Sequence, residues 1–321
     1  MESKKIVKLG EGRPIIVIPT IRSEEVFTKF MDAWKQEFQG CHIIVVEDRK
    51  KKILDPLMSS YSGFTYEIFD WKDIDKDLKE KAWIIPRQTD CVRSYGYYKA
   101  WQQNPLFIVT LDDDVLPERY HKDIFNNKTT HIAQFYNNLF IKKYPNHNFY
   151  NTMKGNHLPR GTYIDSAGCD VSHGCWTNVP DFSAVEHSKN PYITVGKEAF
   201  NEGLVPKGAY VSLCGMNLAW KPFVTKHMYF GLQGGDYPID RCGDIWCGYR
   251  LCKEGYKIYT GGPYCQHNKA SNLWTNMKKE ANAEEMSLQI VDGEPFWSEE
   301  AYGHTLEKAE KVWESLFENG K

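Results

Sequence analysis

The segment Leu106–Pro117, with the sequence LFIVTLDDDVLP, constrains the fold of this 321-residue chain more than any other. Its first six residues are mostly apolar and rich in β-formers, which predicts a strand buried on both faces. Three carboxylates, Asp112, Asp113 and Asp114, follow at the carboxyl end of that strand, where ligands of open α/β sheets bind. Such oxygen ligands suit Mg²⁺ or Mn²⁺ held together with substrate phosphates. From the three acids alone, a metal–diphosphate site and an acidic turn that caps the next segment are equal alternatives.

The residues before this segment alternate between strand and helix patterns. The expected strands are 15–18, 42–46 and 63–69, and the expected helices are 24–38, 71–81 and 89–102. In the first helix, a buried face is predicted from the helical spacing of Val26, Phe30, Met31, Trp34 and Phe38. This alternation predicts an α/β fold with a doubly wound, mostly parallel sheet. The sequence has no G-x-G-x-x-G fingerprint and no P-loop, so a nucleotide would be held through side chains and a metal ion.

The second half of the chain has a less regular pattern. Residues 144–181 are rich in Gly, Asn, His and Pro, which predicts a long functional or mobile loop. Two dense stretches follow at 213–220 and 229–249, and we interpret the second as a wall of the acceptor side that becomes helical over 244–253. A last strand is expected at 257–260.

The expected domain organisation is a single domain over residues 1–321. Its nucleotide-binding half covers about 13–143 and its sugar or acceptor half about 144–280. An amphipathic helix at about 299–318 is expected to dock on the body of the protein, through a stripe formed by Tyr302, Leu306, Ala309, Trp313 and Leu316.

Composition excludes several classes of function. A formal net charge of −2 without a basic tail argues against nucleic-acid binding. No apolar run approaches the roughly 20 residues that span a bilayer, and the N-terminus lacks the apolar region of a secretory signal. Nine cysteines without a C-x-x-C pair indicate reduced thiols. We therefore expect a cytoplasmic protein without an integral membrane segment, and peripheral membrane attachment and homo-oligomerisation are left open.

Seven stretches resemble, in the same order, the reversibly glycosylated polypeptides of plants, the family that includes the UDP-arabinopyranose mutases. The stretches are Val17–Arg22 (VIPTIR), Arg93–Tyr97 (RSYGY), Thr110–Asp114 (TLDDD), Val171–Asp181 (VSHGCWTNVPD), Cys214–Ala219 (CGMNLA), Met228–Leu232 (MYFGL) and His267–Glu280 (HNKASNLWTNMKKE). Each is modest alone, but seven in register over about residues 15–280 are very hard to obtain by chance.

The resemblance implies a nucleotide-diphospho-sugar fold of the glycosyltransferase A type, acting on a UDP-sugar with Mn²⁺ or Mg²⁺. By analogy, Asp112 and Asp114 flank the metal and the ribose, with Asp113 between them. His267 is implied as a further metal ligand, because it opens a stretch that matches the family. The alternative for His267 is a structural histidine.

The resemblance also implies a nucleotide-binding set, to which Asp112 and Asp113 belong. Thr20, Arg22 and Asp48 follow the first two strands and are placed beside uracil and ribose. Arg93 precedes the acidic strand and is suited by its planar guanidinium to pair with the diphosphate. The alternative for Arg93 is an arginine on a helix surface.

On the catalytic side, Arg160 in the tripeptide PRG matches the arginine that becomes glycosylated in the family. A guanidinium is a poor nucleophile, so either its pKa is strongly depressed or a carboxylate attacks first. Asp244 is the candidate for that carboxylate or for the base, and Asp165 and Asp170 are weaker candidates. The resemblance fails in two places: residues 162–168 lack the family's second arginine, and Gly243-Asp244 stands where the family has two acids.

Three functions therefore remain. The first is a UDP-sugar mutase that interconverts UDP-arabinopyranose and UDP-arabinofuranose through a protein-held sugar. The second is a glycosyltransferase that passes the sugar to another acceptor. The third is a non-catalytic, self-glycosylated scaffold.

Overall fold

The computed structural model describes residues 10–118, 130–144, 166–235, 237, 239–268, 272–280 and 301–318. Its strands are β1 Pro14–Thr20, β2 His42–Glu47, β3 Thr65–Phe69, β4 Phe107–Leu111, β5 Val115–Pro117, β6 Lys143–Tyr144, β7 Ser166–Ala167, β8 Val171–Asn178, β9 Gly203–Leu204, β10 Asn217–Trp220 and β11 Ile258–His267. Its α-helices are α1 Glu24–Trp34, α2 Asp55–Ser59, α3 Trp71–Leu78, α4 Val92–Trp101, α5 His131–Tyr136, α6 Ala184–Lys189, α7 Gly243–Lys253, a helix over 273–280, and α9 Ala301–Ser315. Short 3-10 helices cover Lys79–Ile84, Lys197–Ala199 and Pro222–His227, and a π-helical turn covers Asn137–Ile141.

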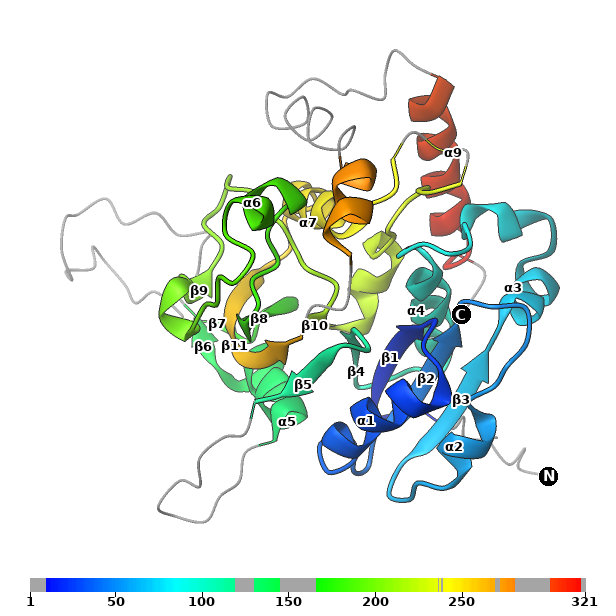
Figure 1. The fold of residues 1–321 in the computed structure, drawn as a ribbon, viewed down its shortest axis with the longest axis horizontal. Helices are drawn as coiled ribbons and strands as arrows, with labels where there is room; N and C mark the ends of the chain where they lie inside the picture. The colour runs from blue at the N-terminus through cyan, green and yellow to red at the C-terminus, as the bar shows by residue number, and fades with distance from the viewer. Residues whose placement is uncertain are drawn as a thin grey trace.

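One mixed sheet of nine strands organises this part of the chain, in the order β3-β2-β1-β4-β10-β8-β11-β5, with β9 also paired to β11 (Figure 1). The first four strands in this order are all parallel, and every residue of β2 and β4 is buried. This is the expected composition of a parallel sheet covered on both faces. The predicted α/β class with a doubly wound, mostly parallel sheet is confirmed, although Leu106, predicted as the first residue of β4, lies before the strand and is exposed.

The other half of the sheet contains strands that the sequence did not predict, and β8 and β10 are the longest of them. β10 runs antiparallel between β4 and β8, and β8 pairs in parallel with β11. β8 reads VSHGCWTN and lay in the stretch 144–181, which was interpreted as a loop, whereas β10 has only four residues and lay in the dense stretch 213–220, which was assigned no secondary structure. β11 is also longer than predicted, since it continues beyond a register shift between Gly261 and Cys265 to pair with β5.

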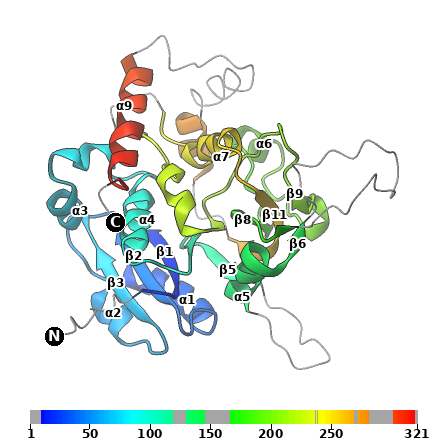
Figure 2. The ribbon, with the colours of Figure 1, turned by 180° about the vertical axis from the view of Figure 1, so that it is seen from behind.

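Helices cover both faces of the sheet, and each face has its own apolar core (Figures 1 and 2). α1, α2 and α5 pack on one face, and α3, α4, α7 and α9 contribute to the core on the other. In α1 the prediction of Val26 as a core residue was wrong: it is 42% exposed, and Phe27 is buried instead. On the opposite face, α4 packs directly against the strands. A Cβ at Gly96 would lie 2.5 Å from a methyl carbon of Val17.

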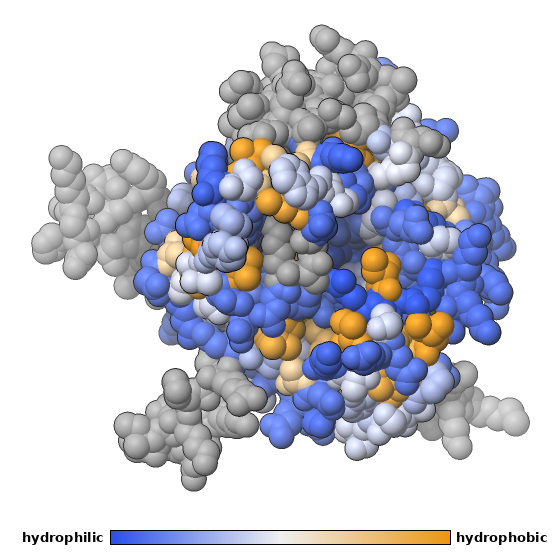
Figure 3. Space-filling model, viewed as in Figure 1, coloured by the Kyte–Doolittle hydropathy of each residue, from blue (hydrophilic) through white to orange (hydrophobic). Residues whose placement is uncertain are grey.

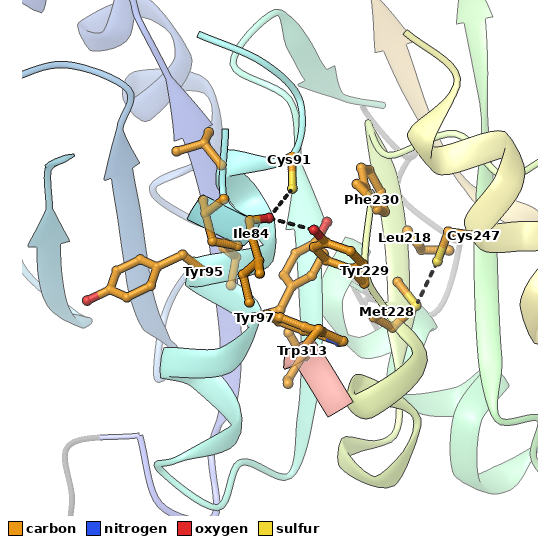
Figure 4. Packing of buried hydrophobic residues seen from close by; sticks show 14 of the residues in the cluster. Ile84, Cys91, Tyr95, Tyr97, Leu218, Met228, Tyr229, Phe230, Cys247 and Trp313 are labelled. Carbon is orange, nitrogen blue, oxygen red and sulfur yellow. Dashed lines mark hydrogen bonds between the residues drawn. The ribbon is translucent and has the colours of Figure 1, made fainter. Parts of the chain in front are cut away.

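The core on the α4 side includes residues interpreted from sequence as a wall of the acceptor site. Tyr229 stacks on Trp313 with ring centroids 5.3 Å apart and donates a hydrogen bond to the carbonyl of Ile84 at 2.6 Å (Figure 4). Tyr229 and its neighbour Phe230 are both buried, so that interpretation was wrong for these two residues. Trp313 belongs to α9, which packs on the body through Leu306, Ala309 and Trp313. Within the described part of the chain, no helix combines the length and apolarity needed to cross a membrane.

Candidate functional site

A cavity of about 450 Å³ lies at the carboxyl ends of β1, β2 and β4. Its walls come from residues 19–22, Asp48, the loop and first turn of α4 at 88–93, the acids 112–114, residues 240–241, and the polar face of the helix over 273–280. Hydrophilic side chains predominate on the face of the molecule shown in Figure 3, and apolar ones are scattered in small groups. The structure thus brings Thr20, Arg22, Asp48, Arg93 and all three acids of the Asp112–Asp114 run to one cavity.

Asp113 is held by the loop that follows β1. The hydroxyl of Thr20 donates to its Oδ2 at 2.6 Å, and Nε of Arg22 donates to its Oδ1 at 3.1 Å. Nη2 of Arg22 also lies 3.7 Å from Oδ2 of Asp114. Burial nevertheless raises the pKa of Asp113, even though both partners favour its ionised form. Thr20 and Arg22 therefore position the acidic run as well as lining the cavity.

Arg93 is a buried arginine that forms an ion pair with Asp112. Its Nη2 donates to Oδ1 of Asp112 at 2.7 Å, its Nη1 to the carbonyl of Gly215 at 2.8 Å, and its Nε to the carbonyl of Asp90 at 3.3 Å. Arg93 is 4% exposed, so the alternative of a helix-surface arginine was wrong. The predicted contact with a diphosphate stays a prediction. The contacts observed show that Arg93 fixes one carboxylate of the acidic run.

Asp114 and His267 come together where β5 pairs with β11. His267 pairs with Val115, and its Nδ1 lies 2.8 Å from the carbonyl of Val179. Donation to that carbonyl leaves Nε2 with the lone pair, as a metal ligand requires. Burial, the charge of Asp112 and that of Asp113 raise the pKa of Asp114 to about 6, although the nearby His267 lowers it.

These acids fit the chemistry of a hard divalent cation. The three carboxylates of the acidic run pair with two guanidinium groups, those of Arg22 and Arg93, so the carboxylates outnumber the guanidinium groups that pair with them. Within the described residues, no three His, Cys, Asp or Glu side chains gather into a ready metal cage. Mg²⁺ sites commonly use one or two carboxylates and complete their coordination with substrate phosphates and water. Metal binding by Asp112, Asp114 and His267 thus stays a prediction.

Asp48 lies on the cavity wall just after β2. Its Oδ1 accepts a hydrogen bond from the indole nitrogen of Trp71 at 2.6 Å, and its own amide donates to the carbonyl of Thr20 at 2.9 Å. Burial raises the pKa of Asp48, partly offset by backbone donors at Gln88 and Thr89. This placement is compatible with the predicted contact to uracil or ribose, which stays a prediction.

Asp244 lies at the start of α7, behind the cavity wall. Its Oδ2 accepts a hydrogen bond from the amide of Gly215 at 3.1 Å, and its Oδ1 accepts one from the amide of Ile245 at 2.9 Å. Burial, followed by the charges of Asp90 and Asp181, raises its pKa to about 7. A carboxyl group that titrates near neutral pH can act as a general acid or base. Gly215 and Arg93 connect it to the cavity.

The other predicted catalytic residues are not part of this arrangement. Arg160 and Asp165 lie outside the residues that the structure describes. Asp170 accepts a hydrogen bond from the amide of Lys257 at 3.0 Å and pairs with Lys221, so it joins the start of β8 to β11. This role is structural. Asp170 lies beside the first residues of β8 and β11, whereas β5, which follows the acidic run, pairs with the last residues of β11. Asp170 is therefore a poor candidate for the catalytic carboxylate.

The sequence analysis missed several polar residues of the cavity. The helix over 273–280 contributes Lys279, which pairs with Asp240 at 2.6 Å. On the same side, Arg241 pairs with Glu280 at 3.0 Å. The sequence does contain a pattern that indicates this wall of the cavity. Residues 272, 275, 276 and 279 are polar and follow the spacing of one helix face.

Residues 11–320 match the family model described as Reversibly glycosylated polypeptide. UDP-arabinopyranose mutase 1 of Oryza sativa subsp. japonica is 32% identical over 318 residues, which are 94% of this chain and 82% of that relative. UDP-arabinopyranose mutase 3 of Arabidopsis thaliana is 32% identical over 301 residues, 89% of this chain and 75% of the relative.

Among solved structures, a crystal structure of a mycobacterial protein superposes with a TM-score of 0.48 and 9% identity, covering 89% of this chain and 77% of that one. A likeness this distant carries no argument about function. The sequence relationships, by contrast, extend over nearly the whole chain and include the acidic run, the loop after β1 and the helix over 273–280. The chain belongs to the reversibly glycosylated polypeptide family.

Proposed function

We propose that the protein is a UDP-sugar mutase that interconverts UDP-arabinopyranose and UDP-arabinofuranose through a protein-held sugar. The observation that carries the proposal is the cavity at the ends of β1, β2 and β4, in which three consecutive carboxylates are held by Thr20, Arg22 and Arg93. The activity named for the relatives in rice and Arabidopsis supports the choice of sugar.

We also propose that the enzyme uses Mn²⁺ or Mg²⁺, held by Asp112, Asp114 and Nε2 of His267. The support is that three carboxylates of the acidic run pair with only the two guanidinium groups of Arg22 and Arg93 among the described residues. When bound, such an ion supplies Lewis-acid stabilisation of the negative charge on the diphosphate.

The protein's own residues would divide the remaining tasks. Asp48 and Thr20, on the wall formed by the ends of β2 and β1, would orient the nucleoside. Lys279, on the helix over 273–280, adds a cation to the opposite wall. Asp244, with its pKa near 7, would exchange a proton with the sugar. Arg160 would hold the sugar, on the evidence of its PRG sequence alone.

Product analysis with UDP-arabinopyranose and Mn²⁺ tests the proposal. The proposal predicts UDP-arabinofuranose in the nucleotide-sugar fraction. UDP release with sugar transferred to a foreign acceptor would instead establish a glycosyltransferase, and protein-bound sugar without either product would establish a scaffold. Asp112→Asn is the matched variant, because it keeps the size of the side chain and removes the charge that pairs with Arg93.

The glycosyltransferase remains the second candidate for a specific reason. Residues 162–168 lack the second arginine expected from the family, and Gly243 stands where an acid is expected. These departures lie on the catalytic side and leave the acidic run unchanged. We further propose a cytoplasmic location, supported by nine cysteines that are all free thiols.

A further inference from the structure

Two ion pairs at the edge of the cavity join the helix over 273–280 to the chain just before α7. Nζ of Lys279 lies 2.6 Å from Oδ2 of Asp240. Nη1 of Arg241 lies 3.0 Å from Oε1 of Glu280. We propose that Lys279 leaves Asp240 to bind the diphosphate of a bound nucleotide, and that Asp240 competes with the diphosphate for this lysine. Asp240 is then a positioning residue that acts through Lys279. The inference rests on the proposed function only in taking a nucleoside diphosphate as the ligand.

The end of β11 places this helix beside the acidic run. The amide of Asn268 donates to the carbonyl of Asp114 at 3.1 Å, so the chain passes the acidic run a few residues before the helix begins. Oδ1 of Asn272 then accepts hydrogen bonds from two backbone amides of the first helical turn, at 3.0 and 3.2 Å. Asn272 and Lys279 both line the cavity that contains the three carboxylates. The helix therefore presents Lys279 to the predicted diphosphate site.

The other end of the helix is fixed without the help of Lys279. Oε1 of Glu280 pairs with Arg241, and Oε2 of Glu280 accepts a hydrogen bond from the amide of Ala184 at 2.6 Å. These contacts join the helix to α6 and to the chain before α7. The backbone at Lys279 can therefore stay in place while its side chain, which has a flexible four-carbon stem, turns to another partner.

Four cations of the described residues line the cavity, and they differ in how firmly each is held. Arg93 is buried and bound to one carboxylate and two carbonyls. Arg22 contacts two carboxylates of the acidic run, and Arg241 pairs with the carboxylate that fixes the helix. Lys279 has Asp240 as its one ion-pair partner in the described part of the chain. Lys279 is thus the cation that can change partner with the least disturbance of the protein.

The pair between Lys279 and Asp240 is of an exchangeable kind. The two side chains are 36% and 26% exposed, and ion pairs that reach water stabilise a protein only weakly, because water screens their charges. A diphosphate carries more negative charge than one carboxylate and offers more acceptor oxygens to an ammonium group. A nucleoside diphosphate in the cavity is therefore the stronger partner for Lys279.

This exchange gives Asp240 a definite effect on affinity. Because the ion pair must break before Lys279 can bind phosphate, UDP binds less tightly than it would without the carboxylate. The substrate and the product of the proposed isomerisation carry the same diphosphate. A carboxylate that recaptures the lysine therefore favours release of one nucleotide sugar and entry of the next.

The experiment is calorimetric titration with UDP and with uridine, at one fixed Mn²⁺ concentration. Lys279→Met should weaken UDP binding by about tenfold, because a charge-assisted contact is lost. Asp240→Asn should strengthen UDP binding by about three- to fivefold, because the competing charge is removed. Neither substitution should change uridine affinity, since uridine has no phosphate. Lys279→Gln provides the same test if the methionine variant folds poorly.

Another lysine–aspartate pair supplies the matched controls. Nζ of Lys99 lies 2.9 Å from Oδ2 of Asp77, and neither residue is among those that line the cavity. Lys99→Met and Asp77→Asn change the net charge of the protein by the same amounts as the two test substitutions. UDP affinity should stay at the wild-type value in both controls.

The double variant separates competition for the lysine from a simple relief of repulsion. If Asp240 acts through Lys279, adding Asp240→Asn to Lys279→Met should not change UDP affinity further. An equal gain in both backgrounds would show that Asp240 only repels the anion, and it would overturn the inference. Unchanged UDP affinity in the folded Lys279→Met or Lys279→Gln variant would overturn it as well.

Product analysis tests the proposed function separately. If the affinities change as expected but no furanose product forms, the proposed function fails and the inference stands, because a glycosyltransferase also binds a nucleoside diphosphate. Furanose formation with unchanged UDP affinity in Lys279→Met would have the opposite meaning. A wild-type protein that does not bind UDP would overturn both.

Discussion

Replacing Asp244 by asparagine should change the pH dependence of stability in a direction that the structure fixes. The pKa of this carboxyl is raised from 3.8 to about 7 in the folded protein, chiefly by burial and then by Asp90 and Asp181. Between these values the folded state keeps a proton that the unfolded state has lost. The carboxyl's contribution to stability is therefore fully present below about pH 4 and is lost as the pH rises through 7.

The magnitude follows from the same shift. Between pH 5 and pH 8 the wild-type protein should lose roughly 2.5 kcal/mol of unfolding free energy through this group alone. Asparagine cannot titrate, so Asp244→Asn should become more stable relative to the wild type by about that amount over the interval. Its amide can accept only one of the two backbone N–H groups, at Gly215 and Ile245. That loss is independent of pH and shifts the whole curve by about 1–3 kcal/mol.

The assay is urea unfolding of both proteins at several pH values, without nucleotide or added metal. Buried His131 and His173, whose pKa values are lowered to about 4 by burial, also titrate, but they do so in both proteins and cancel in the difference. A difference in unfolding free energy that is constant from pH 5 to pH 8 would refute the reasoning. It would show that Asp244 is already ionised at pH 5 in the folded state.

Substitutions at three further positions test the site. Arg160→Ala should lose furanose formation while keeping UDP affinity, measured by product analysis and calorimetry, and Arg160→Lys should fail as well because an ammonium lacks the planar fork. His267→Ala should weaken Mn²⁺ affinity by about tenfold or more in a calorimetric titration. Gly215→Ala would place a methyl carbon 2.6 Å from Nη1 of Arg93. Arg93 must then move away from Asp112, so UDP affinity should fall and unfolding free energy should drop by about 1–3 kcal/mol.

His267→Ala and Gly215→Ala each have a matched control. His187 is also buried and bonded to a carbonyl, that of Pro180 at 2.7 Å, so His187→Ala should lower thermal stability without changing Mn²⁺ affinity. Gly196 faces only the mobile end of the exposed Glu198 side chain, so Gly196→Ala should leave UDP affinity intact. Full turnover in Arg160→Ala would remove that arginine from the mechanism. Unaltered UDP affinity in Gly215→Ala would show that Arg93 does not fix the acidic run.

The parallel half of the sheet could be predicted because each of its strands has a recognisable pattern within its own residues. β1, β2 and β4 are short, mostly apolar runs, as expected of parallel strands covered on both faces, and polar residues lie at or directly after their carboxyl ends. The carboxyl ends of such strands meet at one edge of the sheet, so the sequence alone could place Thr20, Asp48 and the acidic run together. The structure brings them to one cavity, as expected.

The other half of the sheet is stabilised by contacts between residues that are far apart in the sequence, and a local sequence pattern cannot predict such contacts. β8 carries glycine, histidine and cysteine, and β10 is only four residues long. What stabilises them is pairing with distant strands and the buried amide of Asn217, which donates to the carbonyls of Cys175 and Pro263 at 3.2 and 2.8 Å. Neither Cys175 nor Pro263 is near Asn217 in the sequence, so a local pattern could not predict either strand.

Arg93 shows why the role of a site residue is harder to predict than its location. The sequence placed it before the acidic strand and assigned it to the diphosphate, as its charge and geometry allow. The structure surrounds it with Asp112 and the carbonyls of Gly215 and Asp90, and makes glycine necessary at 215 because a side chain there would collide with the guanidinium. A cation buried in this way stabilises a protein carboxylate before any ligand arrives. Arg241 and Lys279 line the same cavity and are also paired with carboxylates, those of Glu280 and Asp240, so a ligand's phosphates would compete with a protein carboxylate for each of these three cations.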